Sequence, residues 1–152
     1  VAILNFGSVV ATGESFVHIS NSATQPVPVL AVETPWQTQL SLPTQAINNG
    51  TTTSTLTVPV GKRLTIEFVS APSNFTNPQV SVTDLAITTT AASAAATYVL
   101  NFNPCCQSFS LSQLVRIYAD PGSTVTVTAT YNNGGASPSI PVSLSGLLVP
   151  AP

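Results

Sequence analysis

The sequence predicts an all-β fold, namely a single β-sandwich of about nine or ten short, mainly antiparallel strands, of jelly-roll or immunoglobulin-like type. Two observations carry this prediction. Apolar and polar residues alternate with a period of two along most of the 152 residues, which is typical of strands with one buried face. Turn-forming groups of Gly, Pro, Asn and Asp recur between these runs, and helix signals are almost absent.

The clearest strand covers residues 64–68, in which Leu64, Ile66 and Phe68 are expected to share one face. The threonine and the glutamate between them are expected on the opposite face. The alanine-rich run 91–96 is the one segment that could instead form a helical turn or a small-residue loop. The alternation predicts further strands at 3–11, 15–21, 27–33, 38–42, 53–58, from 80, from 98, and at 114–119, 125–131 and 140–145.

Specific turns separate these strands. The segments 59–61 (Pro-Val-Gly) and 120–122 (Asp-Pro-Gly) are turn signals. The second suits a tight turn, because proline presets φ and glycine accepts a positive φ. The segment 132–134 (Asn-Asn-Gly) predicts a hairpin that joins the strands at 125 and 140. Four prolines interrupt residues 25–43. Proline has no N–H group to donate to the hydrogen bonds of a central strand. This stretch is therefore expected to be a long loop or a guarded edge strand, that is, an edge strand whose prolines prevent pairing with another molecule.

Charge is scarce. Only 5% of the residues are charged and the net charge is −2, whereas about a quarter are charged in a typical globular protein. Three basic residues cannot neutralise a row of phosphates, so nucleic acid is not expected as a partner. No apolar run reaches the length of about 18 residues that indicates a membrane-spanning helix. Low charge leaves little repulsion between copies, so the chain is expected to associate with itself.

The first residues carry the assembly hypothesis. Val1, Ala2, Ile3, Leu4 and Phe6 form an uncharged, β-prone segment. Such a strand can complete the sheet of a neighbouring molecule, and a head-to-tail contact of this kind propagates a fibre. Alternatively, residues 1–11 form the first strand of their own sandwich, within one domain that spans 1–152. The absence of an initiator methionine favours removal of a signal peptide, and therefore an extracellular or cell-surface location.

No catalytic residue is predicted. The five acids are not closely spaced, so no glycosidase pair is indicated. His18, the single histidine, is accompanied by no nucleophile-elbow motif. The chain is therefore expected not to be an enzyme, and no cofactor is expected. The acids are Glu14, Glu33, Glu67, Asp84 and Asp120.

A metal site is not predicted either. Calcium prefers clustered carboxylate, amide and main-chain oxygens. Asp120 and the pair Asn132-Asn133 would form such a cluster only if their turns converged, which is a weak signal. In so uncharged a chain, Arg63 is more readily paired across strands, with Asp84 or Asp120 as the candidates.

The two cysteines, Cys105 and Cys106, are adjacent. They can remain reduced, form a strained vicinal disulfide, or bond to two other chains, and an exported protein favours oxidation. Asn49 and Asn74 begin the two glycosylation sequons. Trp36 is the best candidate for stacking on a sugar ring; the alternative is that it closes one end of the core.

Three segments resemble segments found in this order in a group of small secreted bacterial proteins. They are 58–70 (VPVGKRLTIEFVS), 115–123 (VRIYADPGS) and 145–150 (SGLLVP). The resemblance covers about the second half of the chain. It implies export and a single β-sandwich, and it implies no activity.

The sequence therefore predicts a non-catalytic extracellular structural protein, a self-assembling subunit of a surface filament, coat or lattice, whose partners are copies of itself. The alternative is a monomeric secreted module that binds glycan or another surface ligand, with Trp36 in its site.

Overall fold

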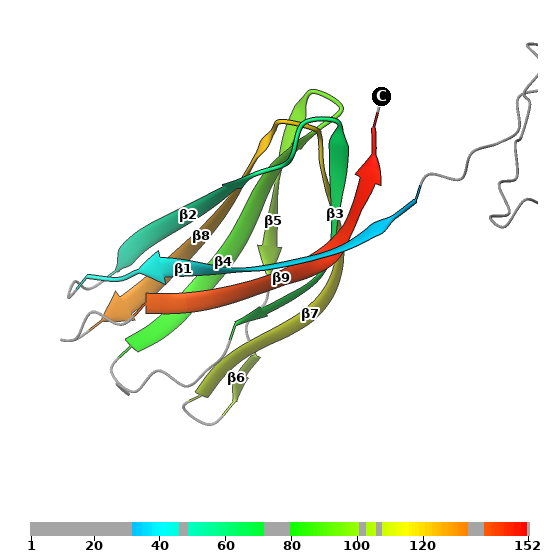
Figure 1. Ribbon diagram of the computed structural model, residues 1–152. Coiled ribbons are helices and arrows are strands. Elements are labelled where there is room, and N and C mark those ends of the chain that lie inside the picture. Colours follow the sequence, from blue (N-terminus) through cyan, green and yellow to red (C-terminus); the bar gives the residue numbers. More distant parts are fainter. Residues whose placement is uncertain are drawn as a thin grey trace, which may run out of the picture. The chain divides into compact units, whose positions relative to one another are not determined.

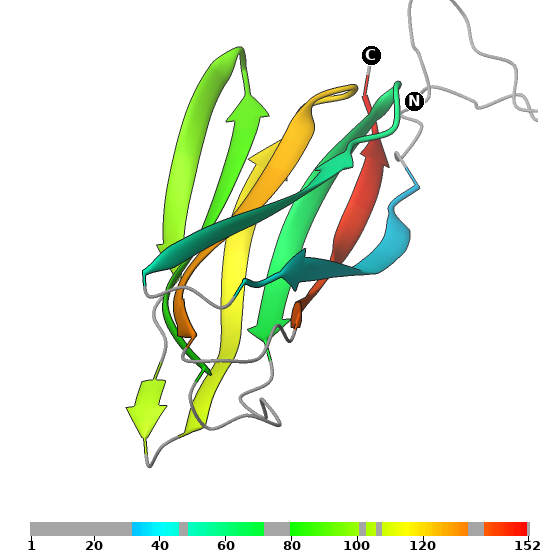
Figure 2. The same ribbon diagram turned by 90° about the vertical axis from the view of Figure 1, so that its left-hand side faces the viewer.

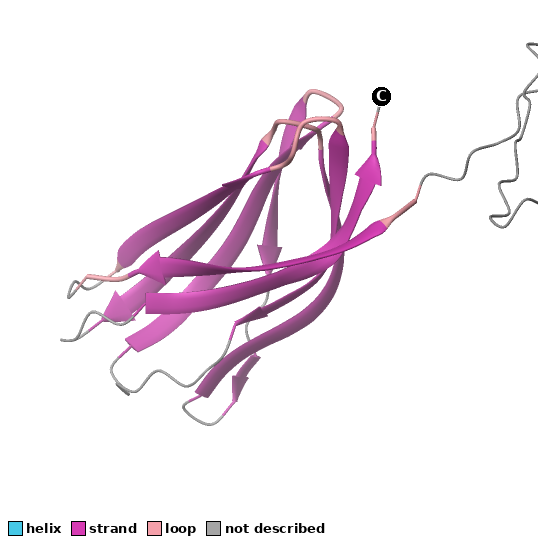
Figure 3. Ribbon diagram, in the orientation of Figure 1, coloured by secondary structure: helices cyan, strands magenta, loops and turns pink. Residues whose placement is uncertain are grey.

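The computed structural model describes residues 32–45, 49–71, 80–100, 103–105, 108–133 and 139–151. This part of the chain consists of strands and turns (Figure 3), so the all-β prediction is confirmed. It contains no helix that is long and apolar enough to cross a membrane. The predicted strands 3–11 and 15–21 and residues 27–31 lie outside the described residues. The nine strands are β1 (Thr34–Pro43), β2 (Gly50–Thr57), β3 (Lys62–Ala71), β4 (Val80–Ala91), β5 (Ala94–Leu100), β6 (Asn103–Cys105), β7 (Ser108–Ala119), β8 (Thr124–Asn133) and β9 (Ser139–Pro150).

The strands form two antiparallel sheets that pack against each other as a β-sandwich (Figures 1 and 2). One sheet has the order β1-β9-β3-β7-β6 and the other the order β2-β8-β4-β5. The pairing is nested, since β1 pairs with β9, β2 with β8, β3 with β7 and β4 with β5. This is the order of one long two-stranded ribbon rolled into two sheets, the jelly roll. Of the two predicted sandwich types, the structure therefore has the jelly-roll order.

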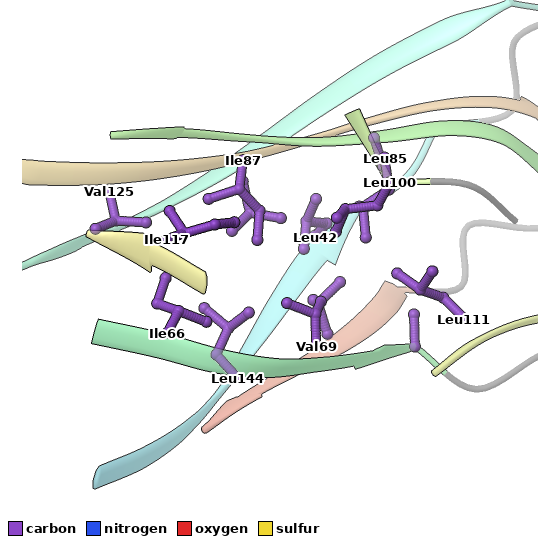
Figure 4. Close-up of a cluster of buried hydrophobic side chains, with 14 of the residues drawn as sticks. Leu42, Ile66, Val69, Leu85, Ile87, Leu100, Leu111, Ile117, Val125 and Leu144 are labelled. Atoms are coloured by element: carbon purple, nitrogen blue, oxygen red, sulfur yellow. The ribbon is translucent and has the colours of Figure 1, made fainter. Parts of the chain in front are cut away.

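The core lies between the sheets and is built from alternate residues (Figure 4). In β8, Val125, Val127 and Ala129 are fully buried, whereas the threonines between them are partly exposed. Ile66 and Leu144 are buried in the facing sheet. The period of two in the sequence therefore separates core from surface as predicted, because side chains alternate between the faces of a strand.

The predicted turns at 59–61 and 120–122 are confirmed. The amide of Lys62 donates to the carbonyl of Pro59 at 3.1 Å, and the amide of Ser123 donates to the carbonyl of Asp120 at 3.1 Å. The glycines at 61 and 122 have φ of 73° and 71°. Both turns have a glycine with positive φ at the third position. Proline occupies the second position in the turn at 120–122 and the first position in the turn at 59–61.

The alanine-rich run forms a tight hairpin and not a helical turn. β4 ends at Ala91 and β5 begins at Ala94. Between them, Ala92 and Ser93 have φ of 51° and 63°. Two consecutive residues with positive φ match the right-handed twist of the flanking strands. Both expectations for the run as a whole, a helical turn or a small-residue loop, are therefore wrong: only Ala92 and Ser93 form a turn, and the other four residues belong to β4 and β5.

The predicted hairpin at 132–134 is wrong. Asn132 and Asn133 belong to β8, which pairs with β2 and β4. β9 lies in the other sheet, between β1 and β3. β8 and β9 therefore belong to different sheets and do not form a hairpin. A turn signal shows where a strand ends, but it does not show which sheet the next strand joins.

Candidate functional site

Two rows of outward-facing side chains cross β1, β9 and β3. The register pairs Gln37 with Ser145, and Ser145 with Phe68. These three residues form one row, because paired residues share a face of the sheet. The next row consists of Gln39, Ser143 and Ser70. Within it, Nε2 of Gln39 lies 3.5 Å from Oγ of Ser143 and donates a hydrogen bond to it.

The rows line a depression in two adjoining parts. One part has a volume of about 490 Å³ and is lined by both rows. The other has a volume of about 550 Å³ and is lined by Trp36, Glu67 and Gly146 among others. Gln37 and Ser145 line both parts, so the two are continuous. Each part lies within the range of roughly 300–1,000 Å³ that is usual for small-molecule sites.

A β-bulge in β3 brings Glu67 and Phe68 to this face together. Relative to β9, the register shifts between Ile66 and Phe68, so β3 holds one extra residue there. Ile66 and Val69 are both fully buried, and the two residues between them are only partly buried. The prediction that Phe68 shares a face with Leu64 and Ile66 is therefore wrong. Bulges commonly re-aim a side chain next to a functional site.

Gly146 permits this bulge. It pairs with Ile66, the last β3 residue before the shift, and with Trp36 on its other side. A Cβ at position 146 would overlap the carbonyl oxygen of Thr65. A glycine inside a strand often marks such a close backbone approach. The floor of the second part of the depression is consequently main chain.

Trp36 lies next to both the hydrophobic core and the depression. It is partly buried and packs against the hydrophobic core. It also lines the second part of the depression. Its place in β1 next to Gln37 therefore puts the single tryptophan of the chain at the border between the core and the candidate site.

The depression offers hydrogen-bonding groups and little charge. The amides of the two glutamines donate and accept, the hydroxyls of the three serines do the same, and Glu67 supplies a carboxylate that accepts. Phe68 adds an apolar ring. The other described acids lie on different elements: Glu33 precedes β1, Asp84 is in β4 and Asp120 follows β7. Sequence reasoning missed Gln37 and Gln39, although their spacing of two in one strand was a usable signal.

A second candidate surface is formed by the edges of the four-stranded sheet. β2 and β5 are its outer strands, and neither contains a charged residue or a proline. Every residue of β5 from Ala94 to Val99 is exposed, on both faces of the strand. Val99 is 61% exposed. By contrast, β1 is an edge strand that contains Pro35 and Pro43, which confirms the predicted guarded edge for that segment.

Arg63 and Asp120 have a structural role at one end of the sandwich. Nε of Arg63 lies 3.4 Å from Oδ1 of Asp120, so the structure selects Asp120 over Asp84, the other candidate partner. Oδ2 of Asp120 accepts a hydrogen bond of 2.6 Å from the amide of Ala92 in the β4–β5 turn. The carbonyl of Val58 accepts from the amide of Gly122 at 3.0 Å. These contacts tie three turns to one another.

The remaining predicted residues are placed as follows. Asp120 precedes β8 and Asn132 lies near the end of β8, roughly 30 Å away by strand rise, so the segments considered for calcium do not converge. In the described residues, no three His, Cys, Asp or Glu side chains gather as metal ligands.

Asn49 is exposed, has φ of 58°, and its amide donates to Oδ1 of Asn132. Cys105 ends β6. The predicted residues outside the described part are Val1, Ala2, Ile3, Leu4, Phe6, His18, Asn74 and Cys106.

Comparison of the chain with protein-family models, with curated proteins and with solved structures finds no significant match.

Proposed function

We propose that the protein is a non-catalytic extracellular structural subunit that assembles by joining its four-stranded sheet to that of the next copy. The observation that carries the proposal is that both edges of this sheet, β2 and β5, are free of charge and proline. An edge strand presents unpaired main-chain N–H and C=O groups, and soluble proteins usually block it with charge, proline or a bulge. Here neither edge carries a charge or a proline.

The directions of the strands suit a head-to-tail contact. All neighbours in the sheet are antiparallel, so β2 and β4 run one way and β8 and β5 the other. When one copy is translated along the sheet, its β2 runs antiparallel to β5 of the preceding copy. The two strands are of similar length, eight and seven residues. A contact between different edges does not close on itself and therefore extends as a fibre.

The side chains at these edges are compatible. Val99 pairs with Ala86 on the outer face of the sheet, whereas Tyr98 pairs with the buried Ile87 on the core side. In β2, Thr53 and Thr55 are exposed. Val99 would thus lie beside threonines of the next copy, a β-branched pairing that favours sheet formation. With a net charge of −2, repulsion between copies is small.

A charge placed on one edge tests the proposal. Val99→Lys is expected to abolish polymers in light scattering and electron micrographs, because it puts a charge in the contact. Leu114→Lys is the matched control, since Leu114 is 82% exposed on β7 in the other sheet, and it should leave polymers intact. Wild-type protein that stays monomeric at high concentration, or a Val99→Lys protein that still polymerises, contradicts the proposal.

A second substitution distinguishes the two possible contacts of β5. In a head-to-tail contact, Val99→Lys combined with Thr53→Glu places opposite charges beside each other, and polymers should return. In a contact of β5 with β5, the lysines still face each other and the double variant stays monomeric. The apolar segment 1–6 is a different route to strand addition. Deletion of residues 1–8 that removes polymers while Val99→Lys does not would assign assembly to that segment.

A further inference from the structure

We propose that the depression on the outer face of β1, β9 and β3 binds a neutral oligosaccharide. This site lies on the five-stranded sheet, whereas the assembly edges belong to the four-stranded sheet. Extending the four-stranded sheet at its edges does not use the outward side chains of Gln37, Ser145 or Phe68. Binding and assembly are therefore separable properties of the protein.

The shape of the site fits an extended ligand. Two adjoining parts of about 490 and 550 Å³ share Gln37 and Ser145. The rows of side chains run across three neighbouring strands. Since neighbouring strands lie roughly 4.8 Å apart, each row spans about 10 Å from β1 to β3. A ligand lying along a row would contact several side chains in succession.

The chemistry of the lining selects a polar ligand without charge. The amides of Gln37 and Gln39 and the hydroxyls of Ser70, Ser143 and Ser145 can each donate and accept. Sugar hydroxyls also donate and accept, so they can satisfy these groups. A purely apolar ligand would leave the amides without partners when it excluded water, at a cost in binding free energy.

Glu67 and Phe68 refine this assignment. The carboxylate is the one charged group of the lining, so it accepts hydrogen bonds from hydroxyls and repels an anionic ligand. The Phe68 ring, next to it because of the bulge, offers an apolar surface for the C–H groups of a sugar ring. Both side chains are only partly buried, so they are accessible.

The single tryptophan makes binding directly measurable. Trp36 lines the second part of the depression, so a bound ligand should change its fluorescence emission. The probes are soluble oligosaccharides of glucose, mannose, xylose and N-acetylglucosamine, with polygalacturonate and hyaluronate as anionic comparators. At least one neutral series is expected to change the emission saturably and to retard the protein in affinity electrophoresis, whereas the anionic probes do neither.

Three variants test the residues. Phe68→Ala and Gln37→Ala are expected to weaken binding by about tenfold or more, the effect of losing one good contact. Glu67→Gln, which keeps the shape of the side chain, should weaken binding less and reduce the discrimination against anionic probes. Val60→Ala is the control, because Val60 is 89% exposed in the turn between β2 and β3 and does not belong to the lining. Thermal unfolding of each variant shows whether it is folded.

Any one of three results would overturn the proposal. The first is an unchanged Trp36 emission with every neutral probe, and the second is equal binding of anionic and neutral probes. The third is unaltered binding in folded Gln37→Ala and Glu67→Gln proteins. If Phe68→Ala does not fold, the other two variants still decide, since Gln37 is exposed and Glu67 is only partly buried.

Discussion

A side-chain carbon at position 146 would overlap the main-chain carbonyl oxygen of Thr65 on the neighbouring strand. Only glycine allows β9 and β3 to approach this closely. The approach occurs next to the bulge that turns Glu67 and Phe68 to the same face. Gly146 therefore allows the close approach of β9 and β3 next to the bulge, and the bulge brings Glu67 and Phe68 into the candidate site.

We therefore expect Gly146→Ala to lower the free energy of unfolding by about 2–3 kcal/mol, because the backbone must shift to relieve the overlap. Chemical denaturation measures this free energy of unfolding. Ser145→Ala, one residue away and partly exposed, should change it by less than about 0.5 kcal/mol. Equal stability of the two variants would show that the strands separate there at no cost.

Asp120→Ala is expected to destabilise the sandwich by about 1–3 kcal/mol, because the amide of Ala92 loses its acceptor at 2.6 Å. Arg63→Ala should cost only about 0–1 kcal/mol, since its side chain is 53% exposed. Asp120→Asn keeps an acceptor oxygen and should recover most of the loss. Arg63→Ala that costs as much as Asp120→Ala would instead assign the stabilisation to the ion pair.

Tyr131→Phe should cost about 1–2 kcal/mol. The Tyr131 hydroxyl accepts a hydrogen bond of 2.8 Å from the amide of Gln45, and the ring is almost completely buried. The bond links β8 in one sheet to the residues that follow β1 in the other. Its removal leaves a main-chain donor without a partner. Urea unfolding measures the loss, and a change below 0.3 kcal/mol or so would mean that water replaces the hydroxyl.

Thr89→Val is expected to raise the free energy of unfolding, by about 1 kcal/mol. Thr89 is 1% exposed, and its hydroxyl has no hydrogen-bond partner in the described part of the chain. Burying an unpaired hydroxyl is unfavourable, and valine has a similar shape. Thr126→Val, on a partly exposed position of β8, is the comparison and should have little effect. A destabilised Thr89→Val protein would show that the hydroxyl has a partner in solution.

The sequence by itself determined the all-β content, the alternation of buried and exposed residues along strands such as β8, and several turns. Alternation along β8 and the turns at 59–61 and 120–122 depend on residues two or three positions apart, and local patterns report such relationships directly. The scarcity of charge also reduced the partners expected for Arg63 to Asp84 and Asp120, of which the structure shows Asp120. These features needed no knowledge of which strands are neighbours.

Only the tertiary structure decided the jelly-roll order, the sheet that receives β9, and the face on which Phe68 lies. Each depends on pairs that are distant in sequence, such as Thr34 with Leu148 or Phe68 with Ser145. A single extra residue in β3 reverses the alternation, because the side-chain period of a strand is two. The strand content is thus a local property of this chain, and the candidate site and the open edges are properties of its packing.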